Sequence, residues 1–230
     1  MANLLHIETS TRICSVAVSE DGLCVFSRED FDGPNHGVVL GLYVDEALAY
    51  ADSRGLLLDA VAVSCGPGSY TGLRIGVSMA KGICYARRLK LIAVPTLALL
   101  CVPVLLRYDN LNEDALLCPM LDARRMEVYS QLFDRRLQTI RPIQADIVEP
   151  STYDTWIEQH PVYFFGNGAA KCQEVLKGAN VHFIDNIQPL AKFMLPLADK
   201  QFLSQQFEDV AYFEPFYLKD FIAKTPKKLL

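Results

Sequence analysis

The chain has 230 residues, of which 51% are hydrophobic, and a formal net charge of −5. This length fits one large domain or two lobes of roughly 100 residues each, and the many aliphatic and aromatic residues exclude a mostly disordered chain. The acidic balance argues against a free-standing nucleic-acid binder, which normally carries a basic excess. No apolar run approaches the ~20 residues of a membrane helix, so no membrane association is expected.

The N-terminal sequence and the cysteines both favour a cytoplasmic protein. Residues 1–6 lack the basic region followed by an apolar stretch that marks a secretory signal. The seven cysteines are scattered and odd in number, which is typical of reduced thiols rather than of a disulfide framework.

The first half of the chain predicts a sheet of mixed direction. Three consecutive antiparallel strands are expected over 4–7, 14–18 and 23–26, with a hairpin turn at 20–22. Strands then alternate with helices, which is typical of an α/β sheet. The further expected elements are a helix over 37–54, a strand over 61–65, a loop over 66–69, a helix over 70–88, a strand over 91–94 and a helix over 95–106.

The second half is a weaker echo of the first. Both halves place an acidic residue at the first hairpin, Glu8 and Asp122, and a pair of glycines after a later strand. The expected elements are strands over 116–121, 127–133 and within 137–148, a helix that starts after 151–154, a strand over 162–165, and helices over 169–177 and about 190–205.

This echo predicts two lobes. We expect an N-terminal lobe over 1–106 and a smaller C-terminal lobe over 107–230, with the last helix free to pack back on the first lobe. The basic tail, with Lys224, Lys227 and Lys228, is expected to be a solvated end.

Two polar loops are candidates for holding an anion. The glycines of 66–72 would let backbone N–H groups and a helix N-terminus approach a phosphate, although the Walker A lysine and the dinucleotide spacing are both missing. A tight structural turn explains these glycines equally well. Glu8-Thr9-Ser10-Thr11 could hold a phosphate through its hydroxyls and a hydrated Mg²⁺ through its carboxylate, but a polar β-turn is the commoner case.

Metal and nucleophile chemistry lack their usual residue patterns. No two of the four histidines, at positions 6, 36, 160 and 182, have the spacing that places two imidazoles on one helical face. The chain also has no G-x-S-x-G elbow, and Cys65 and Cys84, which have no neighbouring histidine in the sequence, are interpreted as core thiols. No catalytic and no metal-binding residue is therefore predicted.

The helices over 37–54 and 70–88 carry more apolar surface than one sheet can cover. In the second helix the apolar residues span an arc of roughly 200°, whereas a helix on a sheet needs a stripe somewhat above 100°. Gly72, Gly76 and Ala80 also form a row of small residues against which another helix could pack closely. Either other parts of the chain cover this surface or it is a subunit interface, and we favour the interface.

Several motifs resemble the bacterial TsaB (YeaZ) family. The most specific is the stretch Gly66-Pro67-Gly68-Ser69-Tyr70-Thr71-Gly72-Leu73-Arg74-Ile75-Gly76. Residues 7–11, 122–129, 166–169 and 215–218 support it, and the resemblance is strong over 1–130 and thinner afterwards. The chain departs from the family pattern at Glu8, where aspartate is usual, and at Met126, where glycine is usual.

The resemblance implies an actin-like ATPase/sugar-kinase (RNase H-like) fold of two related lobes, each with a mixed β-sheet flanked by helices. It implies a non-catalytic subunit in the synthesis of N6-threonylcarbamoyladenosine on tRNA. The implied partners are the catalytic paralogue TsaD and the ATPase TsaE, with a homodimer when the chain is alone and tRNA contact only through the complex. No cofactor is implied for the isolated chain, and a nucleotide only in the complex.

The resemblance also implies two sets of site residues. A degenerate nucleotide cleft would comprise Glu8, Thr9, Ser10, Thr11, Gly66, Gly68, Asp122, Gly166 and Gly168. Interface helices over 36–53 and 70–86 would contribute His36, Val39, Leu42, Tyr43, Glu46, Gly72, Leu73, Ile75, Gly76, Met79, Ala80 and Ile83. The alternatives are a stand-alone ATPase or kinase of the same fold, with Glu8 and Asp122 as its only candidate carboxylates, and, less favoured, a glycoprotease-like metallopeptidase.

Overall fold

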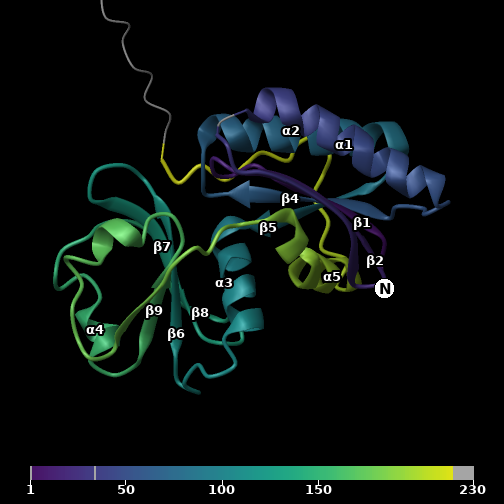
Figure 1. Cartoon of the computed structure of the whole chain (residues 1–230). Coiled ribbons are helices and arrows are strands. Elements are labelled where there is room, and N and C mark those ends of the chain that lie inside the picture. The colour runs from purple at the N-terminus through teal and green to yellow at the C-terminus, as the bar shows by residue number, and fades with distance from the viewer. Residues whose placement is uncertain (1, 34, 220–230) are drawn as a thin grey trace, which may run out of the picture.

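The computed structural model describes residues 2–33 and 35–219, and its first half is a five-stranded sheet with helices on both faces (Figure 1). Its elements are β1 (Leu4–Glu8), β2 (Cys14–Glu20), β3 (Leu23–Asp30), α1 (His36–Ser53), β4 (Ala60–Gly66), α2 (Tyr70–Arg87), β5 (Lys90–Pro95) and α3 (Thr96–Arg107). The strand order is β3-β2-β1-β4-β5, antiparallel from β3 to β1 and parallel from β1 to β5. Every element expected in this half is present.

The second half repeats this topology. Its elements are β6 (Leu116–Asp122), β7 (Glu127–Phe133), β8 (Thr139–Ile147), α4 (Asp154–Ile157), β9 (Val162–Phe165), a 3₁₀ turn (Ala170–Cys172), β10 (Val181–Ile184), a second 3₁₀ turn (Ala191–Phe193) and α5 (Leu195–Leu203). The order β8-β7-β6-β9-β10 has the same pattern of antiparallel and parallel pairs as the first sheet. The expected actin-like fold of two related lobes is therefore confirmed.

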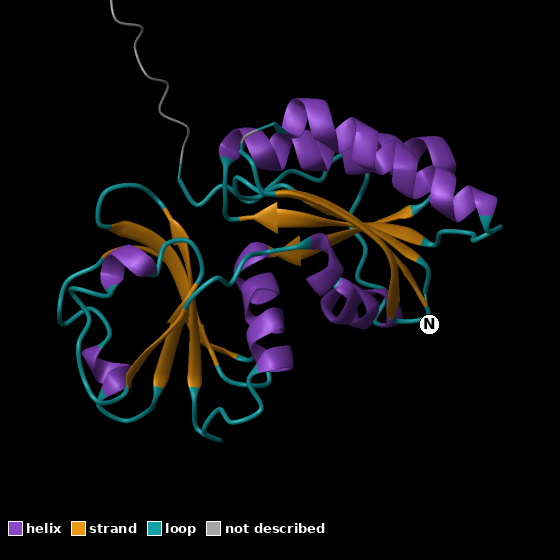
Figure 2. Ribbon diagram, viewed as in Figure 1, coloured by secondary structure: helices purple, strands orange, loops and turns teal. Residues whose placement is uncertain are grey.

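Central strands covered by helices on both faces explain the apolar runs of the first lobe. Every residue of β1 is buried, and α1 and α2 lie together on one face of the sheet (Figure 2). On the other face Leu99 of α3 and Ala198 of α5 pack in one cluster with Leu4. The sheet is thus the middle of three layers.

The helix α3 belongs to both lobes. While Leu99 packs on the first sheet, Leu97 and Leu100 join the core cluster of the second sheet with Leu117 and Phe165. Figure 1 shows α3 between the two sheets. A helix that is buried on nearly its whole circumference matches its almost uniformly apolar sequence.

Three expectations for the second lobe were wrong in detail. The helix expected over 169–177 is only a 3₁₀ turn, and the strand β10 was not anticipated. The last helix starts at Leu195, later than expected, because Pro196 is favoured in a first helical turn rather than in a helix interior. The basic tail lies outside the described residues. Among the residues that the structure describes, none of the helices has the length and apolar character of a membrane span.

The second lobe contains a buried ion pair. Arg141 and Asp146 are both less than a tenth exposed and are joined by two hydrogen bonds, of 2.6 and 3.1 Å. The hydroxyl of Tyr153 donates to the same carboxylate at 2.9 Å, and the guanidinium lies over the rings of Tyr153 and Trp156. Because the aspartate loses its water on folding, it depends on these partners.

Replacing Arg141 with methionine should therefore lower the free energy of unfolding by about 3–5 kcal/mol, because it leaves a buried carboxylate without its cation. Urea denaturation followed by circular dichroism measures the loss. The matched control is Arg125→Met, since Arg125 is exposed and should cost less than about 0.5 kcal/mol. Equal losses in the two variants would contradict the prediction.

Candidate functional site

A cavity of about 680 Å³ opens between the two lobes. The first turns of α1 and α2 meet the β6–β7 turn there, and a C-terminal segment runs along its edge. The residues that line it include Ser10, Thr11, Arg12, His36, Gly68, Ser69, Tyr70, Asp122, Arg124, Glu127, Tyr129, Asn167, Phe216, Tyr217, Leu218 and Lys219.

The polar loop after β1 is packed tightly against the glycine-rich turn. The hydroxyl of Thr9 donates to the carbonyl of Gly72 at 2.8 Å, and the amide of Ser69 donates to the carbonyl of Ser10 at 2.6 Å. A Cβ at Gly68 or Gly72 would overlap the backbone of this loop. The Thr9 hydroxyl and the Ser69 amide, which could have served a phosphate, are therefore engaged within the chain.

Glu8 lies at the centre of this packing. Its carboxylate accepts hydrogen bonds from the amide of Ser10, at 2.6 Å, and from the Ser10 hydroxyl. Burial raises its pKa to about 7, although the hydrogen bonds from Ser10 and Ser64 oppose the rise. The side chain is fully buried and does not line the cavity, so it is not placed to reach a hydrated metal there.

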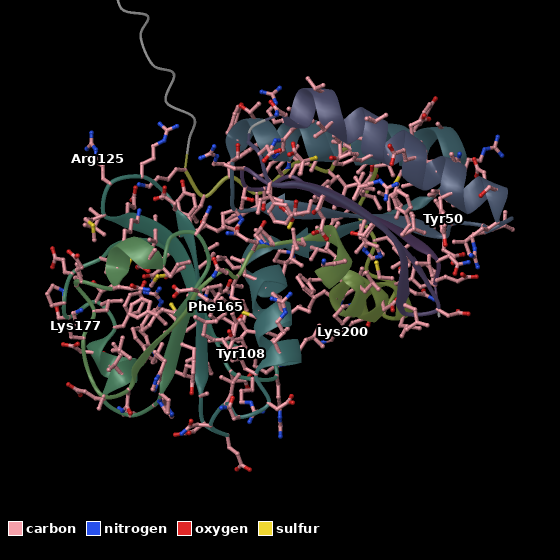
Figure 3. All side chains as sticks on the ribbon, in the orientation of Figure 1. Tyr50, Tyr108, Arg125, Phe165, Lys177 and Lys200 are labelled. Carbon is pink, nitrogen blue, oxygen red and sulfur yellow. The ribbon has the colours of Figure 1, made fainter. Side chains whose placement is uncertain are left out.

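In the second lobe, the polar groups of the β6–β7 turn are also hydrogen-bonded within the chain. Asp122 pairs with Lys171, and its carboxylate also accepts from the amide of Arg124 at 3.0 Å. The side chain of Asn167 accepts from the amide of Asp122 at 2.9 Å. Arg124 lines the cavity, whereas Arg125 points outward from the lobe (Figure 3).

The structure divides the nine expected cleft residues. Ser10, Thr11, Gly68 and Asp122 line the cavity; Glu8, Thr9, Gly66, Gly166 and Gly168 support its walls without lining it. Sequence reasoning missed Arg12, Arg124 and residues 216–219. The arginines adjoin recognised motifs, but the last segment approaches from the far end of the chain, which no local pattern reveals. Among the described residues no group of three or more His, Cys, Asp or Glu side chains could hold a metal ion.

A second hollow, of about 660 Å³, lies on the outer face of α1 and α2. We call it the helix groove. Its lining is mostly apolar, with arginines at the rim, and Arg87 is held there by two hydrogen bonds to Asp52 of 2.7 and 2.8 Å. The lining residues are Leu48, Arg74, Ile75, Ser78, Met79, Gly82, Ile83, Ala86 and Arg87.

The row of small residues does not face this groove. Gly72, Gly76 and Ala80 are buried, and a Cβ at Gly76 would overlap the side chain of Thr9. The expectation that a partner helix packs on this row was therefore wrong, because the chain's own β1–β2 loop occupies it.

The other expected interface residues fall into three groups. Ile75, Met79 and Ile83 line the helix groove. Leu42 is exposed on α1, and Val39, Tyr43 and Glu46 are half-buried, with Glu46 paired to Arg28 at 2.6 Å. Leu73 faces the core, and His36 is buried in the cavity wall rather than exposed on the helix face.

Comparisons with known proteins show which proteins this chain is similar to. The family model of tRNA N6-adenosine threonylcarbamoyltransferase (TsaD) matches residues 33–227. The chain is 28% identical to the tRNA threonylcarbamoyladenosine biosynthesis protein TsaB of Haemophilus influenzae, over 98% of this chain and 96% of that one. The protein of the same name from Escherichia coli is also 28% identical, over 98% and 99%. The solved structure of YeaZ from Pseudomonas aeruginosa superposes with a TM-score of 0.78 at 24% identity, covering 95% of this chain and all of that one.

The buried carboxyl of Glu8 predicts a pH-dependent stability. Its pKa is raised on folding, from an ordinary 4.5 to about 7, so the stabilising effect of the neutral form is complete below pH 4.5 and is lost as the pH rises through 7. Glu8→Gln keeps an acceptor but cannot ionise.

Relative to the parent, this variant should therefore gain about 2 kcal/mol between pH 5 and pH 8. Urea denaturation of both proteins at the two pH values measures the change, and because the comparison is a difference, other titrating groups cancel. A constant difference across this range would show that Glu8 is not buried as described.

Proposed function

The chain belongs to the tRNA N6-adenosine threonylcarbamoyltransferase family, in its TsaB (YeaZ) branch, and we propose that it is a non-catalytic subunit in the biosynthesis of N6-threonylcarbamoyladenosine on tRNA. Its proposed role is to bind the catalytic paralogue, TsaD, and hold it in an active form, with TsaE completing the complex. Contact with tRNA then takes place only through that complex, which fits the net charge of −5.

The closed phosphate loops support a subunit without its own chemistry. The Thr9 hydroxyl donates to the carbonyl of Gly72, the Ser10 amide donates to Glu8 and the Ser69 amide donates to the carbonyl of Ser10. Glu8 is buried and does not line the cavity. Asp122, the other candidate carboxylate of a stand-alone kinase, is bound to Lys171. A nucleotide would have to displace these contacts to gain its own, so the family cleft is proposed to be degenerate in this chain.

The helix groove is the single observation that carries the proposed pairing. Ile75 and Met79 remain half-buried there, because α1 and α2 cover the sheet but leave the flank of their own apolar arc open. An apolar hollow with a charged rim is typical of a surface that becomes buried in a complex. A paralogue of the same fold presents a similar pair of helices, and a second copy of this chain does so when the paralogue is missing.

Depletion of this protein should lower the cellular content of N6-threonylcarbamoyladenosine in tRNA, although the chain itself carries no proposed catalytic residue. Mass spectrometry of digested tRNA nucleosides measures the content, with an unrelated modified nucleoside as the internal control. An unchanged content after depletion would remove the functional proposal.

Met79→Asp should abolish co-purification with the catalytic paralogue, because it places a desolvated charge in the centre of the groove. The control is Val38→Asp, which introduces the same charge on α1 at a position that is 80% exposed and outside the groove. The control should retain the partner, and both variants should keep the parent circular dichroism spectrum. Retention of the partner by folded Met79→Asp would place the interface elsewhere.

A further inference from the structure

After α5, which packs on the first sheet, the chain continues along the first lobe as a strap, which we define as residues 206–219. Its first part is anchored by backbone atoms. The amide of Glu208 donates to the carbonyl of Leu91 at 2.9 Å, and the ammonium of Lys81 donates to the carbonyls of Ala211 and Phe213 at 3.1 and 2.9 Å. Figure 1 shows this yellow segment leaving α5, passing beside α2 and reaching the space between the lobes.

The second part of the strap ends at the cavity between the lobes. The amide of Phe216 donates to the carbonyl of Cys65 at 2.7 Å, where β4 ends. The ring of Tyr217 packs on that of Tyr70, with 4.7 Å between the ring centroids. Residues 216–219 thus form part of the cavity wall from the side of the first lobe.

Lys219 then crosses to the other lobe. Its ammonium pairs with the carboxylate of Glu127, which is the first residue of β7. Glu127 is fixed in its own lobe, since Lys171 donates to its carbonyl at 2.6 Å. The Lys219 side chain is 48% exposed and that of Glu127 is 20% exposed. The two attachments of the strap therefore differ in kind. The first lobe holds backbone atoms of the strap through several hydrogen bonds, two of them from the Lys81 ammonium, and the second lobe holds it through a partly exposed ion pair.

We propose that the strap is a releasable latch, which is fixed to the first lobe and closes the cavity by gripping the second lobe through Lys219 and Glu127. Water reaches this ion pair through the half-exposed Lys219, so salt screens it and the contact can break while both sheets stay folded. Loss of this ion pair allows the lobes to separate around the cavity. The first turn of α2 lies on one side of the cavity and the β6–β7 turn on the other. This inference is independent of the proposed function, because it concerns only contacts within this chain.

Hydrogen exchange of the full-length chain tests the latch. In Lys219→Glu, amides in residues 68–72 and 122–129 should exchange about fivefold faster than in the parent, because the ion pair becomes a repulsion of ordinary surface strength. The control Lys200→Glu makes the same charge change at an exposed site on α5 (Figure 3) and should leave these amides unchanged. Amides in β1 and β4 report the integrity of the fold.

Two further sets of variants distinguish release of the latch from a general loss of stability in the fold. Adding Glu127→Lys to Lys219→Glu should restore slow exchange of the amides in 68–72 and 122–129. Tyr217→Ala should accelerate exchange of the same amides. Its control is Tyr212→Ala, at an 85% exposed tyrosine of the same strap, which should leave them unchanged. Parent-like exchange at 122–129 in Lys219→Glu overturns the proposal, as does equal acceleration in the charge-exchanged variant. If amides in β1 and β4 also exchange faster in Lys219→Glu, that variant has disturbed the fold. The uncharged variant Lys219→Gln then replaces it, and parent-like exchange at 122–129 in Lys219→Gln overturns the proposal.

Discussion

The contact of Thr9 with the backbone of α2 fixes how closely this helix packs on the end of β1. Its hydroxyl is bonded to the carbonyl of Gly72, and neither Gly72 nor Gly76 has room for a Cβ beside it. Because α2 approaches the end of β1 so closely, Thr9 and Ser10 of the β1–β2 loop bond to Gly72 and Ser69 at the start of α2. The same approach sets where the outer flank of α2 lies, and hence where the groove beside α1 opens. The tight packing at the end of β1 and the position of the helix groove are thus linked through one contact.

Much of the first lobe could be predicted from sequence because its signals are local. Alternating apolar residues indicated β2, and Ser69, whose hydroxyl accepts from the amide of Gly72 at 3.2 Å, marks the start of α2. The strand β10 escaped because it has four residues and pairs only with β9. The direction that Gly76 faces could not be predicted for another reason. A small residue gives the same apolar pattern whether it packs against a loop of its own chain or against a partner.

The cavity was only half predictable. Ser10 and Gly68 could be placed there because each follows a strand of the first sheet, and Asp122 because it ends β6, the corresponding strand of the second sheet. Residues 216–219 could not, since their position depends on the path taken after α5. The repeated topology helps to explain why: β1–β5 and β6–β10 are equivalent, but the strap has no counterpart in the first half of the chain. Sequence patterns that reveal a repeat say little about the segments that depart from it.

The packing of α5 on the first sheet affects how the protein is made. The ribosome completes β1, β4 and β5 about 100 residues before Met194 and Ala198, which cover one face of them. At ordinary rates of synthesis this interval is on the order of ten seconds. During that time an apolar sheet surface is exposed to the crowded cell, where it is a substrate for chaperones and a site for wrong association. The lobe that is synthesised first is thus the one whose core is closed last.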